Sequence, residues 1–205
     1  MGAKITAQSL YAAAATALGS VSVGSAFDLT TGAGGIYAKA ISLRLHIDLC
    51  LIGTTAPVSP VLCRLQGRSD WTNWTFRDIA VFATGTTAAV STTINGASGT
   101  AGATAITTNG SATFSARSRD IFFYKSGTLD ESEVVPSVGH VTTTLTLSTG
   151  LRFAQPTATA MYDQAMQFAP SIWVADLQAL RVVVDNNRGA TGSSVYCRAN
   201  IMGWK

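Results

Sequence analysis

Charged side chains are scarce in this chain of 205 residues, which restricts the kind of surface it can have. Lys, Arg, Asp and Glu make up 12% of the sequence, with only four lysines and two glutamates, whereas soluble domains average about 25%. A free monomer is usually kept in solution by a dense surface of mixed charge. We therefore predict that other subunits cover much of this surface. The simpler alternative is a β protein rich in small residues.

Cysteine is also scarce, and Lys and Arg form no cluster. Cys50, Cys63 and Cys197 cannot all pair within one chain, and a sparse, odd number is typical of proteins made in a reducing cytoplasm. We expect Cys50 and Cys63 to be neighbours across a hairpin. The ten arginines are scattered and the net charge is +3, which argues against nucleic acid as a partner.

Long apolar runs and catalytic motifs are missing as well. A membrane-spanning helix needs about 20 apolar residues in a row, but the long uncharged stretches, 5–27 and 79–116, are interrupted by Ser, Thr and Gly. We therefore predict no membrane partner. The sequence has no phosphate-binding loop, no nucleophile elbow and no zinc-protease motif. It thus predicts a protein that is not an enzyme and that needs neither a cofactor nor a metal.

Small residues dominate instead, with 31 Ala, 27 Thr, 19 Ser and 19 Gly, and most of the chain has the period of a β-strand. Residues 43–51 alternate Leu or Ile with polar side chains, which is typical of a strand with one buried face. Further strands are expected at residues 61–66, 75–83, 121–124, 141–147, 172–174, 180–184 and 195–202. These runs are rich in β-branched and aromatic residues. The fold class predicted is all-β, an antiparallel β-sandwich or jelly roll.

The N-terminal segment is the one candidate for a helix. It is rich in alanine, the best helix former, and Gly19 supplies a stop. An extended arm lying flat against a neighbour fits the small residues equally well. We expect residues 1–22 to be this helix or arm and residues 23–205 to be a single domain. The neutral tract 84–116 is too long for an ordered loop, so we expect one or two weak hairpins or contact with another subunit.

One predicted strand carries a candidate polar site. His46 and Asp48 share one face of the strand, beside Arg44 and Cys50. Side chains at i and i+2 can jointly bind a metal or orient a group for proton transfer. His140 is the other histidine of the chain that could supply a third ligand. The favoured interpretation is a row of polar side chains that faces solvent or another subunit.

Two tryptophans stand three residues apart in the segment 70–74. Trp71 and Trp74, with Asp and Asn beside them, could stack on a sugar ring. Tryptophan is also enriched at interface hot spots, and a role in the core or in an interface is favoured. Trp204 indicates that the C-terminal end of the chain is docked. The predicted interface residues are Leu10, Tyr11, Trp71, Trp74 and Trp204.

Two segments carry a resemblance to a known class of proteins: FDLTTGAGGIY at residues 27–37, which leads into the alternating strand, and SDWTNW at residues 69–74. Together they resemble the minor head and decoration (cement) proteins of tailed bacteriophages, over residues 23–83. The resemblance implies a structural protein that stabilises the capsid by binding the major capsid protein or other virion proteins, as a homo-oligomer. Its location would be the virion, assembled in the bacterial host cytoplasm. The alternatives are a neck or tail component and a carbohydrate-binding receptor module.

Overall fold

The structure, a computed structural model, describes residues 8–17, 19–31, 37–38, 40–69, 75–110, 114, 119–187 and 194–204. Within these residues, the chain forms strands β1 to β16 and the short 3-10 helix η2 (Leu129–Glu131). None of the helical segments described is long and apolar enough to cross a bilayer. The prediction of an all-β fold is confirmed.

The first sheet is built around β4 (Ser42–Ile52), the strand with the clearest alternation in the sequence. On one side, β4 pairs with β16 (Ser194–Trp204), and β1 (Gln8–Thr16) lies beyond it. On the other side, it pairs with β13 (Ala165–Phe168) and β14 (Ser171–Trp173). All of these pairings are antiparallel. The Leu and Ile side chains on one face of β4 are fully buried, as a period of two requires.

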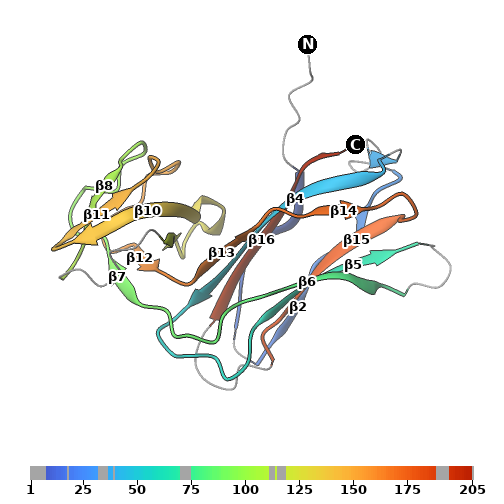
Figure 1. Cartoon of the computed structure of the whole chain (residues 1–205), viewed down its shortest axis with the longest axis horizontal. Helices are drawn as coiled ribbons and strands as arrows, with labels where there is room; N and C mark the ends of the chain where they lie inside the picture. The colour runs from blue at the N-terminus through green and yellow to red at the C-terminus, as the bar shows by residue number, and fades with distance from the viewer. Residues whose placement is uncertain are drawn as a thin grey trace, which may run out of the picture.

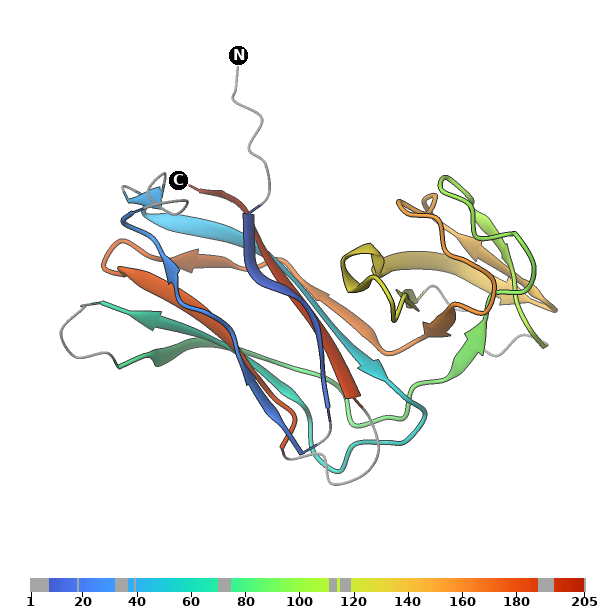
Figure 2. The same ribbon diagram turned by 180° about the vertical axis from the view of Figure 1, so that it is seen from behind.

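The second sheet packs against the first, and together they form an antiparallel β-sandwich (Figures 1 and 2). Its strands, in spatial order, are β2 (Val21–Val23), β15 (Ala179–Asp185), β5 (Leu62–Arg68) and β6 (Arg77–Ala83), and β3 (Phe27–Asp28) also pairs with β15. The inward side chains of both sheets make one hydrophobic core. The antiparallel sheets of the prediction are therefore observed, while the jelly-roll topology stays a prediction.

A third sheet forms a separate part of the molecule (Figure 1). In spatial order it contains β7 (Ser91–Thr93), β12 (Ala160–Tyr162), β9 (Asp120–Tyr124), β10 (Glu133–Val141), β11 (Thr144–Leu147) and β8 (Ala105–Thr107). A bridge between Ile94 and Thr108 joins the two ends of this sheet, which therefore closes around its own hydrophobic core. We call this part the small barrel. The chain leaves the sandwich after β6 and returns to it at β13, so the small barrel is an excursion between two sandwich strands.

The N-terminal helix considered above is wrong, because these residues form β1. The edge of β16 offers backbone hydrogen bonds along most of the length of β1. The Tyr11 hydroxyl also lies 2.6 Å from Ser22 Oγ, and the Tyr11 ring covers Gly24 so closely that a Cβ there would lie 2.7 Å from it. These tertiary contacts outweigh a helix propensity worth less than about 1 kcal/mol per residue. The boundary predicted at residue 22 falls inside β2, which pairs with β15 of the sandwich.

Two further expectations need adjustment in the small barrel. The single strand expected over 141–147 is interrupted by a turn in which Thr142 has a φ of 53°, so Val141 ends β10 and Thr144 begins β11. The neutral tract 84–116 contributes β7 and β8. Its Thr and Ser side chains leave both strands weakly marked in the sequence.

The turn before β12 holds a residue in an unfavourable backbone conformation. Ala158 has a φ of 67°, in a turn that the N–H of Thr159 closes by donating to the carbonyl of Pro156 at 3.1 Å. A residue with a Cβ pays about 1–2 kcal/mol in this left-handed region. We expect Ala158→Gly to raise the free energy of unfolding by about 1 kcal/mol, measured by urea denaturation. Ala154→Gly, at an ordinary φ, is the control and should lower it; equal effects of the two would contradict the explanation.

Candidate functional site

A buried carboxylate organises the most extensive polar cluster on the outer face of the first sheet. Asp48 is fully buried, and its Oδ2 accepts hydrogen bonds from Arg198 Nη2 at 2.7 Å and Nε at 3.1 Å. Its Oδ1 accepts one from Gln167 Nε2 at 2.9 Å and lies 2.9 Å from His46 Nε2. Arg198 and Gln167 lie directly opposite Asp48 on β16 and β13. The strand register therefore assembles the cluster as one row across the sheet.

The charges in this cluster stabilise one another. The hydrogen bond to Asp48 raises the pKa of His46 above 6.5, although burial opposes the shift. Burial alone would raise the pKa of Asp48, but the hydrogen bond from His46 and the charge of Arg198 hold it below 3.8. A buried ionised carboxylate is tolerated only when it is paired and hydrogen-bonded in this way.

The raised pKa of His46 makes stability depend on pH. A group whose pKa is higher in the folded state contributes stability that is complete below its unfolded pKa and is lost as the pH rises through its folded pKa. We therefore expect the stability difference between wild type and His46→Gln to shrink from about pH 6 to about pH 8. Burial lowers the pKa of His140, which gives the opposite slope in both proteins and cancels in the difference. A difference that grows with pH would contradict this assignment.

Arg198 also connects the sandwich to the small barrel. Its Nη1 donates to the carbonyl oxygens of Asp130 and Ser132, both at 3.3 Å, and these residues lie in and beside η2. The hydroxyl of Tyr196, two residues along β16, donates to the carbonyl of Leu129 at 3.3 Å. The polar row of the first sheet is therefore covered by η2, and its function in this geometry is to hold the two parts of the molecule together.

An aromatic cluster adds to these contacts between the sandwich and the small barrel. The rings of Phe122 and Tyr196 have centroids 4.7 Å apart, and both pack with Cys50 in a fully buried group. Phe122 belongs to β9 of the small barrel, while Cys50 and Tyr196 are opposite each other on β4 and β16. We call Asp48, Arg198, Cys50, Tyr196 and Phe122 the joint.

The joint brings together only part of the polar site considered from the sequence. His46 and Asp48 do interact, but their third partner is Arg198. His140 lies in the small barrel, where its Nε2 is 2.9 Å from Thr108 Oγ1. No three His, Cys, Asp or Glu side chains of the described residues are placed to hold a metal ion.

Large apolar side chains are exposed on the part of the first sheet that η2 leaves uncovered. Trp173 is 66% exposed and lies opposite Ser42, the first residue of β4. On the other side of β4, exposed Met202 precedes Gly203, which lies opposite Arg44. We call Trp173, Arg44 and Met202 the Trp173 patch. Its composition is that of interface hot spots, in which Trp and Arg are enriched.

The outer face of the second sheet also exposes apolar side chains. Val23, Val183, Arg64 and Val81 form one row across four strands. Val23 and Val81, at the two edges, are 56% and 51% exposed. Between them, Arg64 Nη1 lies 3.0 Å from Asp78 Oδ2. The sandwich therefore presents apolar side chains on both of its outer faces.

The residues predicted to form an interface are distributed as follows. Leu10 and Tyr11 are buried in the core of the sandwich. Trp71 and Trp74 lie outside the described residues, and of Trp204 only the backbone pairing opposite Leu43 is described. The interface role of these three tryptophans stays a prediction. The sequence reasoning missed Trp173, although the signal was present: it is flanked by Ile172 and Val174, whose burial requires that the residue between them face outward.

The cysteines are arranged differently from the expectation. Cys50 and Cys63 are not hairpin neighbours, because β4 and β5 belong to opposite sheets. Cys63 instead faces Cys197 across the core of the sandwich, with the two Sγ atoms 3.9 Å apart. Cys50 points to the other side of the first sheet, into the joint. All three thiols are free and buried.

The first resemblance segment contains a tight turn that begins at Asp28. The Asp28 carboxylate accepts hydrogen bonds from the backbone N–H groups of Thr30 at 2.7 Å and Thr31 at 3.2 Å, and a further bond from the Thr31 hydroxyl. This last bond is the largest cause that lowers the pKa of Asp28, to about 2. Asp28 thus serves the local turn.

Comparisons with known proteins identify no family. No protein-family model matches the chain, and no curated protein matches it in sequence. The crystal structure of the PBSX exported protein XepA aligns with 96% of this chain and 86% of its own, at 7% identity and a TM-score of 0.23. A structural similarity this weak carries no argument about fold or function.

Proposed function

We propose that the chain is a non-enzymatic structural subunit of a tailed-phage virion, which stabilises the capsid shell as a decoration subunit by binding the major capsid protein or other virion proteins. The observation that carries the proposal is the exposure of apolar side chains on both outer faces of the sandwich. An exposed Trp beside an exposed Arg, as in the Trp173 patch, is typical of interaction sites. Two different faces are what a subunit needs to contact neighbours on two sides.

The composition and the joint support the same proposal. A surface with few charges is suited to contact with protein more than with water. Arg198, held in place by the buried Asp48, and the Phe122–Tyr196 contact attach the small barrel to the sandwich. An assembly subunit benefits from such a connection because a fixed geometry lowers the entropic cost of each contact.

The test combines particle composition with self-association. Mass spectrometry of density-purified phage particles from the strain that encodes the chain should detect it in a fixed ratio to the major capsid protein. In sedimentation velocity, wild type should associate as its concentration rises, and Trp173→Ser should shift this association to higher concentration. Val141→Ser, a change at an exposed residue of the small barrel, is the matched control. Absence from purified particles would overturn the proposal.

A further inference from the structure

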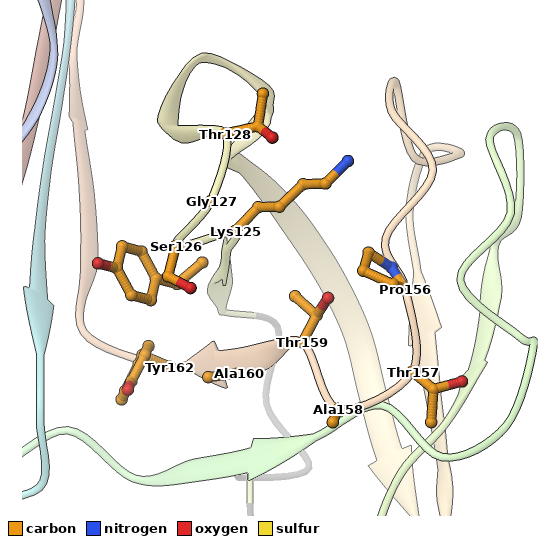
Figure 3. Close-up of a pocket in the computed structure, with 11 residues that line it drawn as sticks. Lys125, Ser126, Gly127, Thr128, Pro156, Thr157, Ala158, Thr159, Ala160 and Tyr162 are labelled. Carbon is orange, nitrogen blue, oxygen red and sulfur yellow. The ribbon is translucent and has the colours of Figure 1, made fainter.

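The small barrel has a hollow of about 470 Å³ on its surface, which the assembly role does not use. The hollow lies between the turn after β9 and the turn before β12. In Figure 3, Lys125 extends above Thr159 toward the side of Pro156, and Tyr162 and Ala160 lie on the opposite side. The volume is within the range of natural ligand pockets, about 300–1,000 Å³.

The lining combines an apolar floor with many unused hydroxyl groups. Ala158, Ala160 and Pro156 are apolar, and Tyr124 and Tyr162 contribute aromatic rings. Five hydroxyl groups of the lining form no hydrogen bond with the described residues. These are the hydroxyl groups of Tyr124, Ser126, Thr128, Thr159 and Tyr162. A ligand that matches this lining has an apolar face surrounded by groups that both donate and accept hydrogen bonds.

The charge of the hollow is balanced, which restricts the ligand class further. Lys125 Nζ pairs with the carboxylate of Glu131 and donates to the carbonyl of Ala154 at 3.2 Å. The ammonium group keeps one N–H for a ligand, but its charge is already neutralised. An anionic ligand such as a phosphate would therefore gain little, whereas a neutral polyol can use the remaining donor.

A second hollow of about 480 Å³ adjoins the first and shares Lys125, Pro156 and Thr157 with it. Gln155 lines this second hollow and is only 3% exposed. Its Nε2 donates to the Glu131 carbonyl at 2.9 Å and to Glu133 Oε1 at 3.1 Å, so the orientation of the amide is fixed by two acceptors. Within the described residues, its Oε1 has no partner. A buried acceptor of this kind requires a donor, and a ligand hydroxyl would supply one once the side chains that cover this oxygen move aside.

The structure assigns the groove made by these two hollows to a neutral oligosaccharide. A pyranose ring has the required chemistry, because its C–H face stacks on aromatic rings while its hydroxyl groups point outward. One sugar unit would lie against the tyrosines in the first hollow, and the chain would continue past Lys125 to the Gln155 acceptor in the second. Trp71 and Trp74 take no part in this groove, and the inference is independent of the proposed assembly role.

The first test uses binding to the intact chain. The probes are maltohexaose, cellohexaose and chitohexaose at millimolar concentration, with amide chemical shifts as the readout. We expect at least one probe to shift the amides of Lys125, Gly127 and Thr159 in a saturable manner. If none of the three probes shifts these amides, the inference is overturned.

Gly127 offers a variant that blocks the groove without disturbing the fold. Gly127 lines the first hollow, and a Cβ there would meet no atom within 4 Å, so Gly127→Leu adds a bulky side chain at the wall of the groove without a clash. This variant should abolish the shifts. Gly203→Leu is the matched control, because a Cβ at Gly203 also meets open space, far from the small barrel on β16. Binding that survives Gly127→Leu would place the sugar elsewhere and overturn the inference.

Removal of single hydroxyl groups tests whether these groups form hydrogen bonds to the sugar or whether the groove only provides space for it. Thr159→Val and Tyr124→Phe keep the shape of the side chains and should each weaken binding by about 3- to 10-fold, the usual effect of one hydrogen bond. Thr146→Val, on an exposed position of β11, is the control and should leave the affinity unchanged. Equal affinities of all three variants and wild type would contradict the hydroxyl contacts.

Discussion

Replacing Asp48 with alanine is expected to lower the free energy of unfolding by about 3–5 kcal/mol, because it leaves the charge of Arg198 buried without its partner. The expected loss is large because the Asp48 side chain is fully buried and that of Arg198 only 18% exposed. Urea denaturation followed by tryptophan fluorescence measures this difference. The same variant should loosen the joint, which small-angle scattering would detect as a change in the separation of the sandwich and the small barrel.

Two further variants make this prediction specific. Asp78→Ala breaks the more exposed pair between Asp78 and Arg64 and should cost no more than about 1 kcal/mol, as is usual for surface ion pairs. The double variant Asp48→Leu with Arg198→Met removes both buried charges and should recover most of the loss. The explanation would be contradicted if Asp48→Ala lost less unfolding free energy than Asp78→Ala, or if the double variant were no more stable than Asp48→Ala.

The sequence predicts the polar row of β4 but not the joint it belongs to. Alternation from Leu43 to Leu51 places His46 and Asp48 on one face and buries the other, because the side-chain period of a strand is fixed. Their partners Arg198 and Gln167 lie 150 and 119 residues from Asp48 in the chain. No local spacing rule connects such distant residues, since register between strands is set by the whole sheet.

The errors at the N-terminus and in the small barrel have one physical cause. Local preferences are weak, and tertiary contacts override them. The alanines of β1 favour a helix locally, but pairing with β16 and the packing of Tyr11 on Gly24 decide the outcome. β7 and β8 have only three residues each, too few for a periodic pattern. The groove around Lys125 depends on two turns of the small barrel and therefore could not be predicted either.

The second large effect concerns the cysteines of the sandwich core. Folding in the presence of oxidised and reduced glutathione is expected to join Cys63 and Cys197 by a disulfide. Their Sγ atoms already face each other at 3.9 Å, so a bond of about 2 Å requires the two sulfur atoms to approach by about 2 Å. In this reaction both thiols lose their protons, and two electrons pass to glutathione disulfide, which becomes two molecules of reduced glutathione.

The bond should form during folding and only slowly in the native protein. The hydrogen bond with Cys63, together with burial, raises the pKa of Cys197, and the thiolate is the form that reacts. Both thiols are also fully buried, so an oxidant reaches them only when the sandwich opens. Native protein mixed with the same glutathione buffer should therefore remain reduced for longer than the refolding chain.

The expected gain in stability follows from the length of the closed loop. Cys63 and Cys197 are 134 residues apart, and the chain-entropy relation predicts a stabilisation of about 5 kcal/mol for a loop of this length. Peptide mapping by mass spectrometry would identify the bond, and thermal denaturation with and without a reducing agent would measure its effect. Cys50→Ala should retain the bond, because Cys50 lies on the other side of the first sheet, whereas Cys63→Ala should lose it. A disulfide that contains Cys50, or equal stability of the oxidised and reduced forms, would contradict the arrangement of the core.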